Sequence, residues 1–139
     1  MTLRPSTGTL ITVAPTGAEH LKGDLPQLPT TTEELVETAV RCEAAGAALI
    51  HIHRRDAEHR PTLDLGLLRE AVAGVREATD LVVQLSTGGS VHDGYAARLA
   101  VLDAAPDSCS LTCGTVNFGD DIFNNPMPFM SELYVAAQE

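Results

Sequence analysis

The sequence predicts an α/β protein made of parallel βα units, about four of the eight units of a TIM barrel. Short β-branched runs alternate along the chain with stretches in which apolar residues recur every three or four positions. The loops that follow the predicted strands contain most of the unusual residues, whereas the loops that precede them are short and plain. Strands that alternate with helices form parallel sheets, and barrels of this kind place their chemistry at the carboxyl ends of the strands.

The first two strands and the helix between them can be read directly from the sequence. Residues 9–14 (TLITVA) form a β-branched run that stops at Pro-Thr-Gly, which predicts a strand followed by a loop. After a long connection, Thr31 and Glu34 have the spacing of a capping box and predict the start of a helix. The apolar stripe of this helix is Leu35, Ala39 and Cys42. Residues 47–53 (AALIHIH) predict the second strand.

The next two helices enclose the third predicted strand. Apolar residues at spacings of three and four predict a helix with the buried stripe Leu65, Leu68, Val72 and Val75. Residues 81–85 (LVVQL) predict the third strand, which Ser-Thr-Gly-Gly closes. Residues 93–104 predict a third helix, with Leu99 and Leu102 on its buried face.

The last predicted unit sets the expected domain organisation. Residues 108–112 predict the fourth strand, and a Pro-rich turn leads to a predicted helix over residues 130–139. Four units are half of an eight-unit barrel. We therefore expect residues 1–139 to be the N-terminal half of a single (βα)8 barrel domain, truncated in its fourth helix.

Composition limits the classes of partner. The chain has 19 acidic against 9 basic side chains and a net charge of −10, which argues against nucleic-acid and anionic-membrane surfaces. No apolar run approaches the roughly 20 residues of a membrane span. The three cysteines, Cys42, Cys109 and Cys113, are odd in number and lack a CxxC motif. They predict reduced thiols and a cytoplasmic location.

His51 and His53 are the leading candidates for chemistry. Residues two apart in a strand point to the same face, so both imidazoles are expected to face the barrel interior, where they can share one zinc ion. A catalytic zinc normally has three protein ligands and an open position, so a third ligand must come from elsewhere. The alternative is a pair of core histidines satisfied by hydrogen bonds.

The loop after the histidine strand carries charged residues with two interpretations. Arg55 can hold a substrate carboxylate through two hydrogen bonds. We favour the alternative, in which Arg55 pairs with Asp56 and fixes the loop. His20 and His92 lie in predicted loops without an identifiable partner, and either is a weak candidate for the third metal ligand.

Three other loops are expected to meet at the same barrel mouth. The segment 86–89 (STGG) can bind an anion through open backbone N–H groups, or it can be a tight turn. Ser110 and Thr112 alternate and can offer hydroxyls to the cavity, or they can be small core residues. Glu19, in the first loop, can bind a cationic group or be solvated.

Five segments, spread over the whole chain, occur in an order typical of one family. They are ITVAPTGAE at 11–19, LPTTTEEL at 28–35, HIHRRD at 51–56, QLSTGGSV at 84–91 and SLTCGTVNFGDDIF at 110–123. Each segment is weak alone, but the ordered combination is specific. The chain resembles the β-keto acid cleavage enzymes, the family that includes 3-keto-5-aminohexanoate cleavage enzyme.

The resemblance implies a zinc-dependent acyltransferase that uses acetyl-CoA. In the implied Claisen and retro-Claisen reaction, a β-keto acid and acetyl-CoA give acetoacetate and a new acyl-CoA. The resemblance assigns His51 and His53 as zinc ligands. The implied substrate-binding residues are Glu19, Ser86, Gly89, Ser110 and Thr112, with Glu19 at the position that meets the substrate amine in the aminohexanoate enzyme.

The resemblance also identifies what this chain lacks. Family members are full barrels of about twice this length and form homo-oligomers. Their third zinc ligand, a glutamate, and their catalytic base, an aspartate, come from the C-terminal half. No motif in this chain matches either residue, so the catalytic base has no assigned residue here.

Two other functions remain open at this stage. The chain can be a non-catalytic remnant or an interaction subunit, because a half barrel exposes strand edges that can pair with another chain. It can also be a metal-dependent hydrolase of the amidohydrolase type, which uses an H-x-H pair at a barrel mouth. In that class the pair normally lies on the first strand, whereas here it lies on the second.

Overall fold

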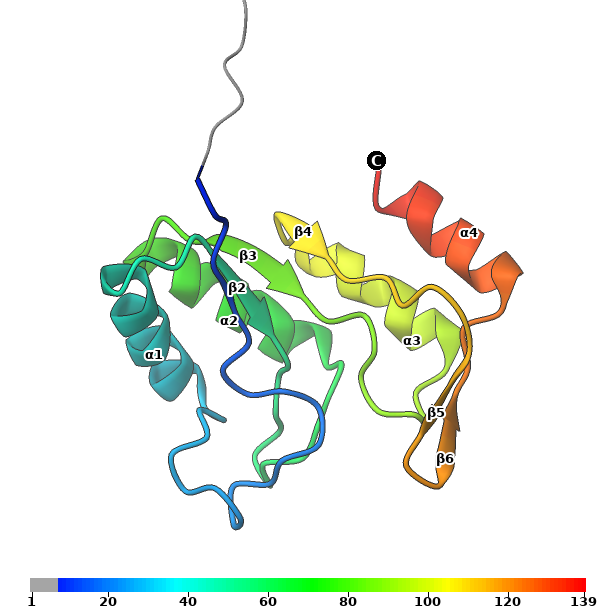
Figure 1. The fold of residues 1–139 in the computed structure, drawn as a ribbon, viewed down its shortest axis with the longest axis horizontal. Helices are drawn as coiled ribbons and strands as arrows, with labels where there is room; N and C mark the ends of the chain where they lie inside the picture. Colours follow the sequence, from blue (N-terminus) through cyan, green and yellow to red (C-terminus); the bar gives the residue numbers. More distant parts are fainter. Residues whose placement is uncertain (1–7) are drawn as a thin grey trace, which may run out of the picture.

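The computed structural model describes residues 8–139 and contains one four-stranded sheet and one two-stranded sheet (Figure 1). The larger sheet is entirely parallel, with its strands side by side in chain order. Its strands are β1 (Thr12–Val13), β2 (Leu49–Ile52), β3 (Val82–Leu85) and β4 (Ser108–Cys109). This order, with helices between the strands, confirms the α/β class and matches part of a TIM barrel.

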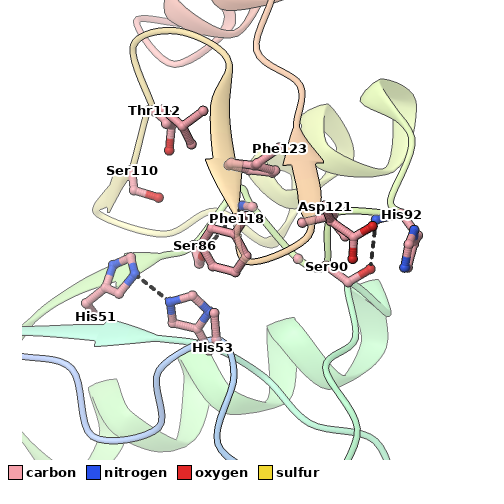
Figure 2. Close-up of a pocket in the computed structure, with 15 residues that line it drawn as sticks. His51, His53, Ser86, Ser90, His92, Ser110, Thr112, Phe118, Asp121 and Phe123 are labelled. Carbon is pink, nitrogen blue, oxygen red and sulfur yellow. Dashed lines mark hydrogen bonds between the residues drawn. The ribbon is translucent and has the colours of Figure 1, made fainter.

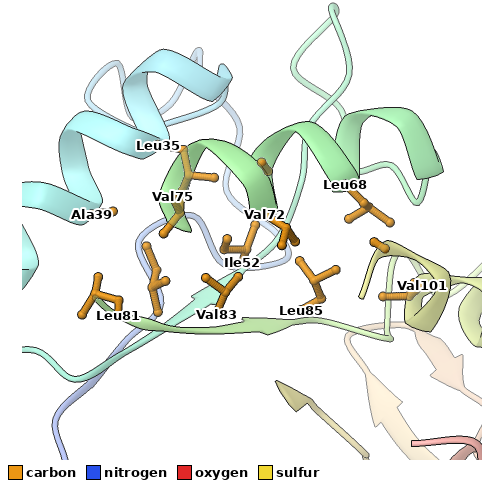
Figure 3. Packing of buried hydrophobic residues seen from close by; sticks show 13 residues of the cluster. Leu35, Ala39, Ile52, Leu68, Val72, Val75, Leu81, Val83, Leu85 and Val101 are labelled. Atoms are coloured by element: carbon orange, nitrogen blue, oxygen red, sulfur yellow. The ribbon is translucent and has the colours of Figure 1, made fainter. Parts of the chain in front are cut away.

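Within the described residues, the helical elements are four α-helices and one 3-10 helix. In order they are α1 (Thr32–Ala44), α2 (Leu65–Ala78), α3 (Tyr95–Ala100), η1 (Val101–Ala104) and α4 (Met127–Ala136). Helices α1 and α2 pack against each other on one face of the sheet (Figure 3). No helix within residues 8–139 is long and apolar enough to cross a membrane.

The hydrophobic core lies between this face and the helices. Strand residues alternate between the two faces of a sheet, so every second residue of β2 and β3 enters the core, and Ile50 pairs with Val83 in the parallel register. Figure 3 shows these side chains against α1, α2 and η1. The cluster comprises Leu35, Ala39, Ile50, Ile52, Leu68, Ala71, Val72, Val75, Leu81, Val83, Leu85, Val101 and Ala104.

The start of α1 follows the sequence prediction. Thr31 is the N-cap, its side chain accepts a hydrogen bond from the Glu34 N–H, and the Glu34 carboxylate accepts one in return from the Thr31 N–H. This reciprocal pair satisfies two helix-terminal N–H groups. At the other end, Gly46 follows the C-cap residue Ala45 with a φ of 98°, a conformation that glycine adopts without strain.

The prediction of the third helix was wrong in two respects. Residues 95–104 form a short α-helix followed by a 3-10 turn rather than one continuous helix. Its buried face is formed by Arg98, Val101 and Ala104, whereas Leu99 and Leu102 are only partly buried. Hydropathy placed the leucines inside, but backbone carbonyls and aromatic rings around Arg98 draw that guanidinium inward instead.

The last third of the chain contains a hairpin that the sequence analysis missed. Strand β4 ends at Cys109 rather than at residue 112, and β5 (Val116–Phe118) then pairs antiparallel with β6 (Asp121–Phe123). The turn is two residues long, and Gly119 takes a φ of 64° at its first position, as such turns require. Helix α4 begins at Met127, because Pro126 and Pro128 suit the N-cap and first turn of a helix.

Candidate functional site

A cavity of about 460 Å³ lies on the side of the sheet opposite the core (Figure 2). It is within the size range of small-molecule sites. Of the seven predicted site residues, six line it: His51, His53, Ser86, Gly89, Ser110 and Thr112. They come from β2 and the residue directly after it, from the loop after β3 and from the segment after β4, as expected for the carboxyl ends of parallel strands.

His51 and His53 stand next to each other at the base of this cavity. Ile50 and Ile52 take the core-facing positions of β2, so His51 between them and His53 directly after the strand project to the opposite face. Their Nε2 atoms are 3.0 Å apart, and the rings meet edge to face at a centroid separation of 4.8 Å. The two imidazoles therefore aim the same ring nitrogen at the same point.

Gln84 and Ser108 flank the histidine pair on the neighbouring strands. The Nδ1 atom of His51 lies 2.8 Å from the Oε1 atom of Gln84, its register partner on β3. The Gln84 amide nitrogen in turn donates to the Ser108 hydroxyl, its register partner on β4, at 2.9 Å. We call these three hydrogen-bonded side chains the Gln84 bridge.

The environment keeps both imidazoles in the neutral form that metals bind. Burial, together with the nearby His51 ring and the Arg55 charge, lowers the pKa of His53 to about 4. Burial also lowers the pKa of His51, although its hydrogen bond with Gln84 opposes the shift. At neutral pH, protons therefore compete little with a cation for these nitrogens.

The donor set fits a zinc ion in part. Zinc–nitrogen bonds are about 2.0–2.1 Å long, so one ion can contact two nitrogens that are 3.0 Å apart. Among residues 8–139, no group of three or more His, Cys, Asp or Glu side chains is placed to hold a metal. His92 lines the cavity, but His20 is exposed outside it. A zinc site built on these two histidines would therefore need a third ligand.

The loop after β3 brings Ser86 and Gly89 to the cavity wall. Much of its backbone is already hydrogen-bonded: the Gly88 N–H donates to the Ser86 hydroxyl, and the Thr87 N–H donates to the Ser110 hydroxyl. The loop therefore presents hydroxyls rather than the open N–H cradle that its sequence suggested. Gly89 has a φ of 61°, and a methyl group there would overlap Asp93 and lie 2.9 Å from Leu63.

Ser110 and Thr112 lie beyond the end of β4, not within it. Both side chains point into the cavity beside His51 (Figure 2), and both residues are partly buried. The Ser110 carbonyl accepts a hydrogen bond from the Thr87 hydroxyl at 2.7 Å, which ties this segment to the loop after β3. Two polar walls of the cavity are thus held together.

Arg55 does not pair with Asp56, which corrects the favoured prediction. Its guanidinium is 1% exposed and donates through one terminal nitrogen to the carbonyls of Gly17 and His20, at 2.9 and 3.1 Å. Asp56 instead accepts from Arg60. The β1 loop had too few regular features to predict this contact.

Glu19 lies between the two carbonyls that Arg55 holds. Its neighbour Ala18 lines the cavity, but Glu19 itself is exposed and is absent from the cavity lining within residues 8–139. Arg55 therefore fixes the loop that carries Glu19 at the rim of the site.

The sequence analysis missed the aromatic wall of the cavity. Val116, Phe118 and Phe123 from the β5–β6 hairpin line it, and Figure 2 shows Phe118 and Phe123 across from the histidines. Arg98 packs 4.4 Å from the ring centroids of Phe123 and Phe129. The two phenylalanines that flank the Gly-Asp turn were the available signal, because aromatic residues around a two-residue turn are typical of hairpins.

Comparison with known proteins agrees with this geometry. The chain is 40% identical over 118 residues to the 3-keto-5-aminohexanoate cleavage enzyme of Fusobacterium nucleatum subsp. nucleatum, a match that covers 84% of this chain and 43% of the relative. It is 36% identical to the 3-oxoadipate:acetyl-CoA acetyltransferase of Cupriavidus necator, covering 84% and 41%. The chain thus spans less than half the length of these relatives.

A solved structure and a family profile also match this chain. A ternary complex of ObcA with a C4-CoA adduct and oxalate superposes with a TM-score of 0.69 at 25% identity, covering 79% of this chain and 29% of ObcA. The profile of the beta-keto acid cleavage enzymes matches residues 9–139. With the ordered motifs and the histidine pair at the strand ends, this match shows that the chain belongs to the β-keto acid cleavage enzyme family.

Proposed function

We propose that this chain provides the zinc-binding half of a β-keto acid cleavage enzyme. The reaction transfers CoA: a β-keto acid and acetyl-CoA give acetoacetate and a new acyl-CoA. The observation that carries the proposal is the convergence of the His51 and His53 Nε2 atoms at the base of the cavity. Zinc held there would act as a Lewis acid and stabilise negative charge that develops on the keto acid oxygens.

The chain's own residues have separate tasks in this proposal. The hydroxyls of Ser86, Ser110 and Thr112 line the cavity and are placed to donate hydrogen bonds to substrate oxygens. Phe118 and Phe123 form the apolar wall and reduce the water around the reacting carbons. Glu19, at the rim, is the residue proposed to meet a substrate that carries an amine.

The names of the relatives support the substrate class. One acts on 3-keto-5-aminohexanoate and another transfers between 3-oxoadipate and acetyl-CoA, so each name specifies a β-keto acid. Both relatives are more than twice as long as their matched region. We assign the third zinc ligand and the catalytic base to a segment that completes the barrel.

Zinc binding is the first test. We expect the chain to bind one zinc ion, measured by competition with a chromophoric chelator, and we expect His51→Ala and His53→Ala to weaken binding by tenfold or more. His20→Ala is the matched control, because His20 is exposed outside the cavity, and its variant should bind as the wild type does. Equal zinc binding by all three variants would contradict the proposal.

Activity distinguishes the proposed reaction from hydrolysis. A protein with a completed barrel should form acetoacetate from a β-keto acid only when acetyl-CoA is supplied. Amide or ester hydrolysis without CoA would favour a hydrolase of the amidohydrolase type instead. Mass spectrometry would detect the acyl-CoA product.

A further inference from the structure

The Gln84 bridge gives the two proposed zinc ligands unequal surroundings. His51 has a partner on each ring nitrogen: the Gln84 Oε1 atom at 2.8 Å on Nδ1 and the His53 Nε2 atom at 3.0 Å on Nε2. No hydrogen-bond partner within residues 8–139 contacts Nδ1 of His53. The bridge therefore acts on one ligand only.

The orientation of the Gln84 amide decides where the His51 proton lies. In the structure, the amide nitrogen donates to the Ser108 hydroxyl at 2.9 Å, and the amide oxygen lies 2.8 Å from Nδ1 of His51. A carbonyl oxygen only accepts hydrogen bonds, so the facing Nδ1 must carry the proton. A neutral imidazole carries one proton, and Nε2 of His51 is therefore left with a lone pair that faces Nε2 of His53.

The short contact between the histidines then fixes the proton of His53. Two nitrogens 3.0 Å apart are held by one proton between them, since two lone pairs or two N–H groups repel each other. Because His51 offers the lone pair, His53 must donate from Nε2. In the metal-free protein, Nε2 of His51 therefore carries a lone pair and Nε2 of His53 carries the proton.

We propose that Gln84, hydrogen-bonded to Ser108, is a positioning residue that holds His51 as its Nδ1–H tautomer and thereby keeps the lone pair on Nε2, the nitrogen proposed to bind the metal. The inference rests on the proposed zinc site and deepens it. If both Nε2 atoms held zinc, the His53 proton would lie on Nδ1 and each ring would remain neutral. Hydrogen bonds to the remote nitrogen of a metal-bound histidine are known to fix its tautomer and raise affinity.

The tautomers can be measured without metal. Long-range ¹H–¹⁵N correlation spectra of the ¹⁵N-histidine-labelled chain at pH 8 separate the Nδ1–H and Nε2–H forms. We expect His51 to be Nδ1–H and His53 to be Nε2–H. Addition of zinc should move His53 to Nδ1–H and leave the His51 tautomer unchanged.

Variants of Gln84 test whether its amide oxygen sets the His51 tautomer. Gln84→Leu removes the acceptor, so His51 should shift toward the Nε2–H form that predominates in water, and zinc affinity should fall about 10–100-fold. Gln84→Glu keeps an acceptor, and it should retain the His51 tautomer and most of the affinity. If Gln84→Leu fails to fold, the tautomer and zinc affinity of Gln84→Glu still test the role of the acceptor. Gln138→Leu, the same change at an exposed position, should alter neither measurement.

Two results would overturn the inference. One is a metal-free wild type in which His51 is Nε2–H, which means that the amide faces the other way. The other is a folded Gln84→Leu protein with an unchanged tautomer and unchanged zinc affinity. If His51 is Nδ1–H but the wild type binds no zinc, the proposed function fails while the role of Gln84 in setting the tautomer is supported.

Discussion

The two faces of the four-stranded sheet are built from alternate residues of the same strands, yet they differ in every physical respect. One face packs Ile50, Ile52, Val83 and Leu85 against helices without a polar partner. The other face carries His51 and Gln84, joined by directional hydrogen bonds beside an open cavity. Because side chains alternate with a period of two residues along a strand, apolar residues reach one face and polar residues reach the other.

The difference shows how the protein divides stability from chemistry. Dispersion and the hydrophobic effect hold the core face, and they tolerate no polar group without a partner. The cavity face holds His51, Gln84 and Ser108 in place through hydrogen bonds between their side chains. We therefore expect substitutions on the core face to affect unfolding, and substitutions on the cavity face to affect binding.

The largest expected effect tests this division directly. Ile52→Ala should lower the free energy of unfolding by about 2–5 kcal/mol, because Ile52 is 1% exposed and its loss leaves a cavity. His53→Ala, the next residue, should cost less than about 1 kcal/mol, since its ring borders open space. Urea denaturation of both variants measures the contrast, and equal losses would show that the faces are not energetically distinct.

Arg98 is an exception to the contrast between an apolar core and a polar cavity face, because it is a buried charge near the cavity. Its guanidinium is 2% exposed and donates to the carbonyls of Thr87 and Asn124 and to the Asn125 side chain. Arg98→Ala should destabilise the protein by about 3 kcal/mol, because these acceptors lose their partner. The exposed Arg69 is the control, and Arg69→Ala should leave the urea midpoint nearly unchanged. Similar midpoint shifts would contradict the assigned role of Arg98.

Two glycines sharpen the comparison within the loops. Gly17 and Gly89 have nearly equal φ values of 64° and 61°, but only Gly89 lacks room for a methyl group. Gly17→Ala should cost about 1 kcal/mol for the left-handed backbone alone. Gly89→Ala should cost about 1–3 kcal/mol more, because the methyl group overlaps Asp93 and Leu63. Thermal unfolding of both variants checks this order, which equal losses would refute.

The smallest expected effect comes from Glu34, which belongs to neither face. Hydrogen bonds from Lys22 and from the Thr30 backbone lower the pKa of this carboxyl to about 2. A folded-state pKa below the unfolded value stabilises the protein at higher pH, and this stabilisation is lost as pH falls from about 4.5 toward 2. The carboxyl is 41% exposed, so the effect should stay below about 1 kcal/mol.

Glu34→Gln tests that pH dependence. The variant should show a flatter dependence of stability on pH over this interval than the wild type, with little difference between pH 6 and 8. Glu37→Gln provides a control on the same helix. An unchanged slope for Glu34→Gln would refute the assignment.

The sequence predicted the parts of the fold that depend on local periodicity. The alternation of β2 and most of the two helix stripes were correct, because apolar spacing dictates which side is buried. Cys42 and Leu65, at one end of each stripe, are only partly buried. The third helix was wrong at Arg98, since hydropathy cannot see the carbonyls and rings that accept a guanidinium. The β5–β6 hairpin was missed because its strands are short and largely exposed.

The candidate site followed the same rule. His51 and His53 were placed together by a strand period, and the structure brings their Nε2 atoms within 3.0 Å. The roles of Gln84 and Arg55 were out of reach, because they depend on strand register and on contacts across the β1 loop. Nothing in the local sequence encodes either distance.

The short reach of the Gln84 bridge has a consequence for biosynthesis. His51 and Gln84 are 33 residues apart, and Gln84 and Ser108 are 24 residues apart, on three consecutive strands of one sheet. Contacts between successive units of the chain form early, since they close small loops. The contacts proposed to set the histidine tautomers can therefore form while later segments are still being translated, before the segment proposed to supply the third zinc ligand has been made.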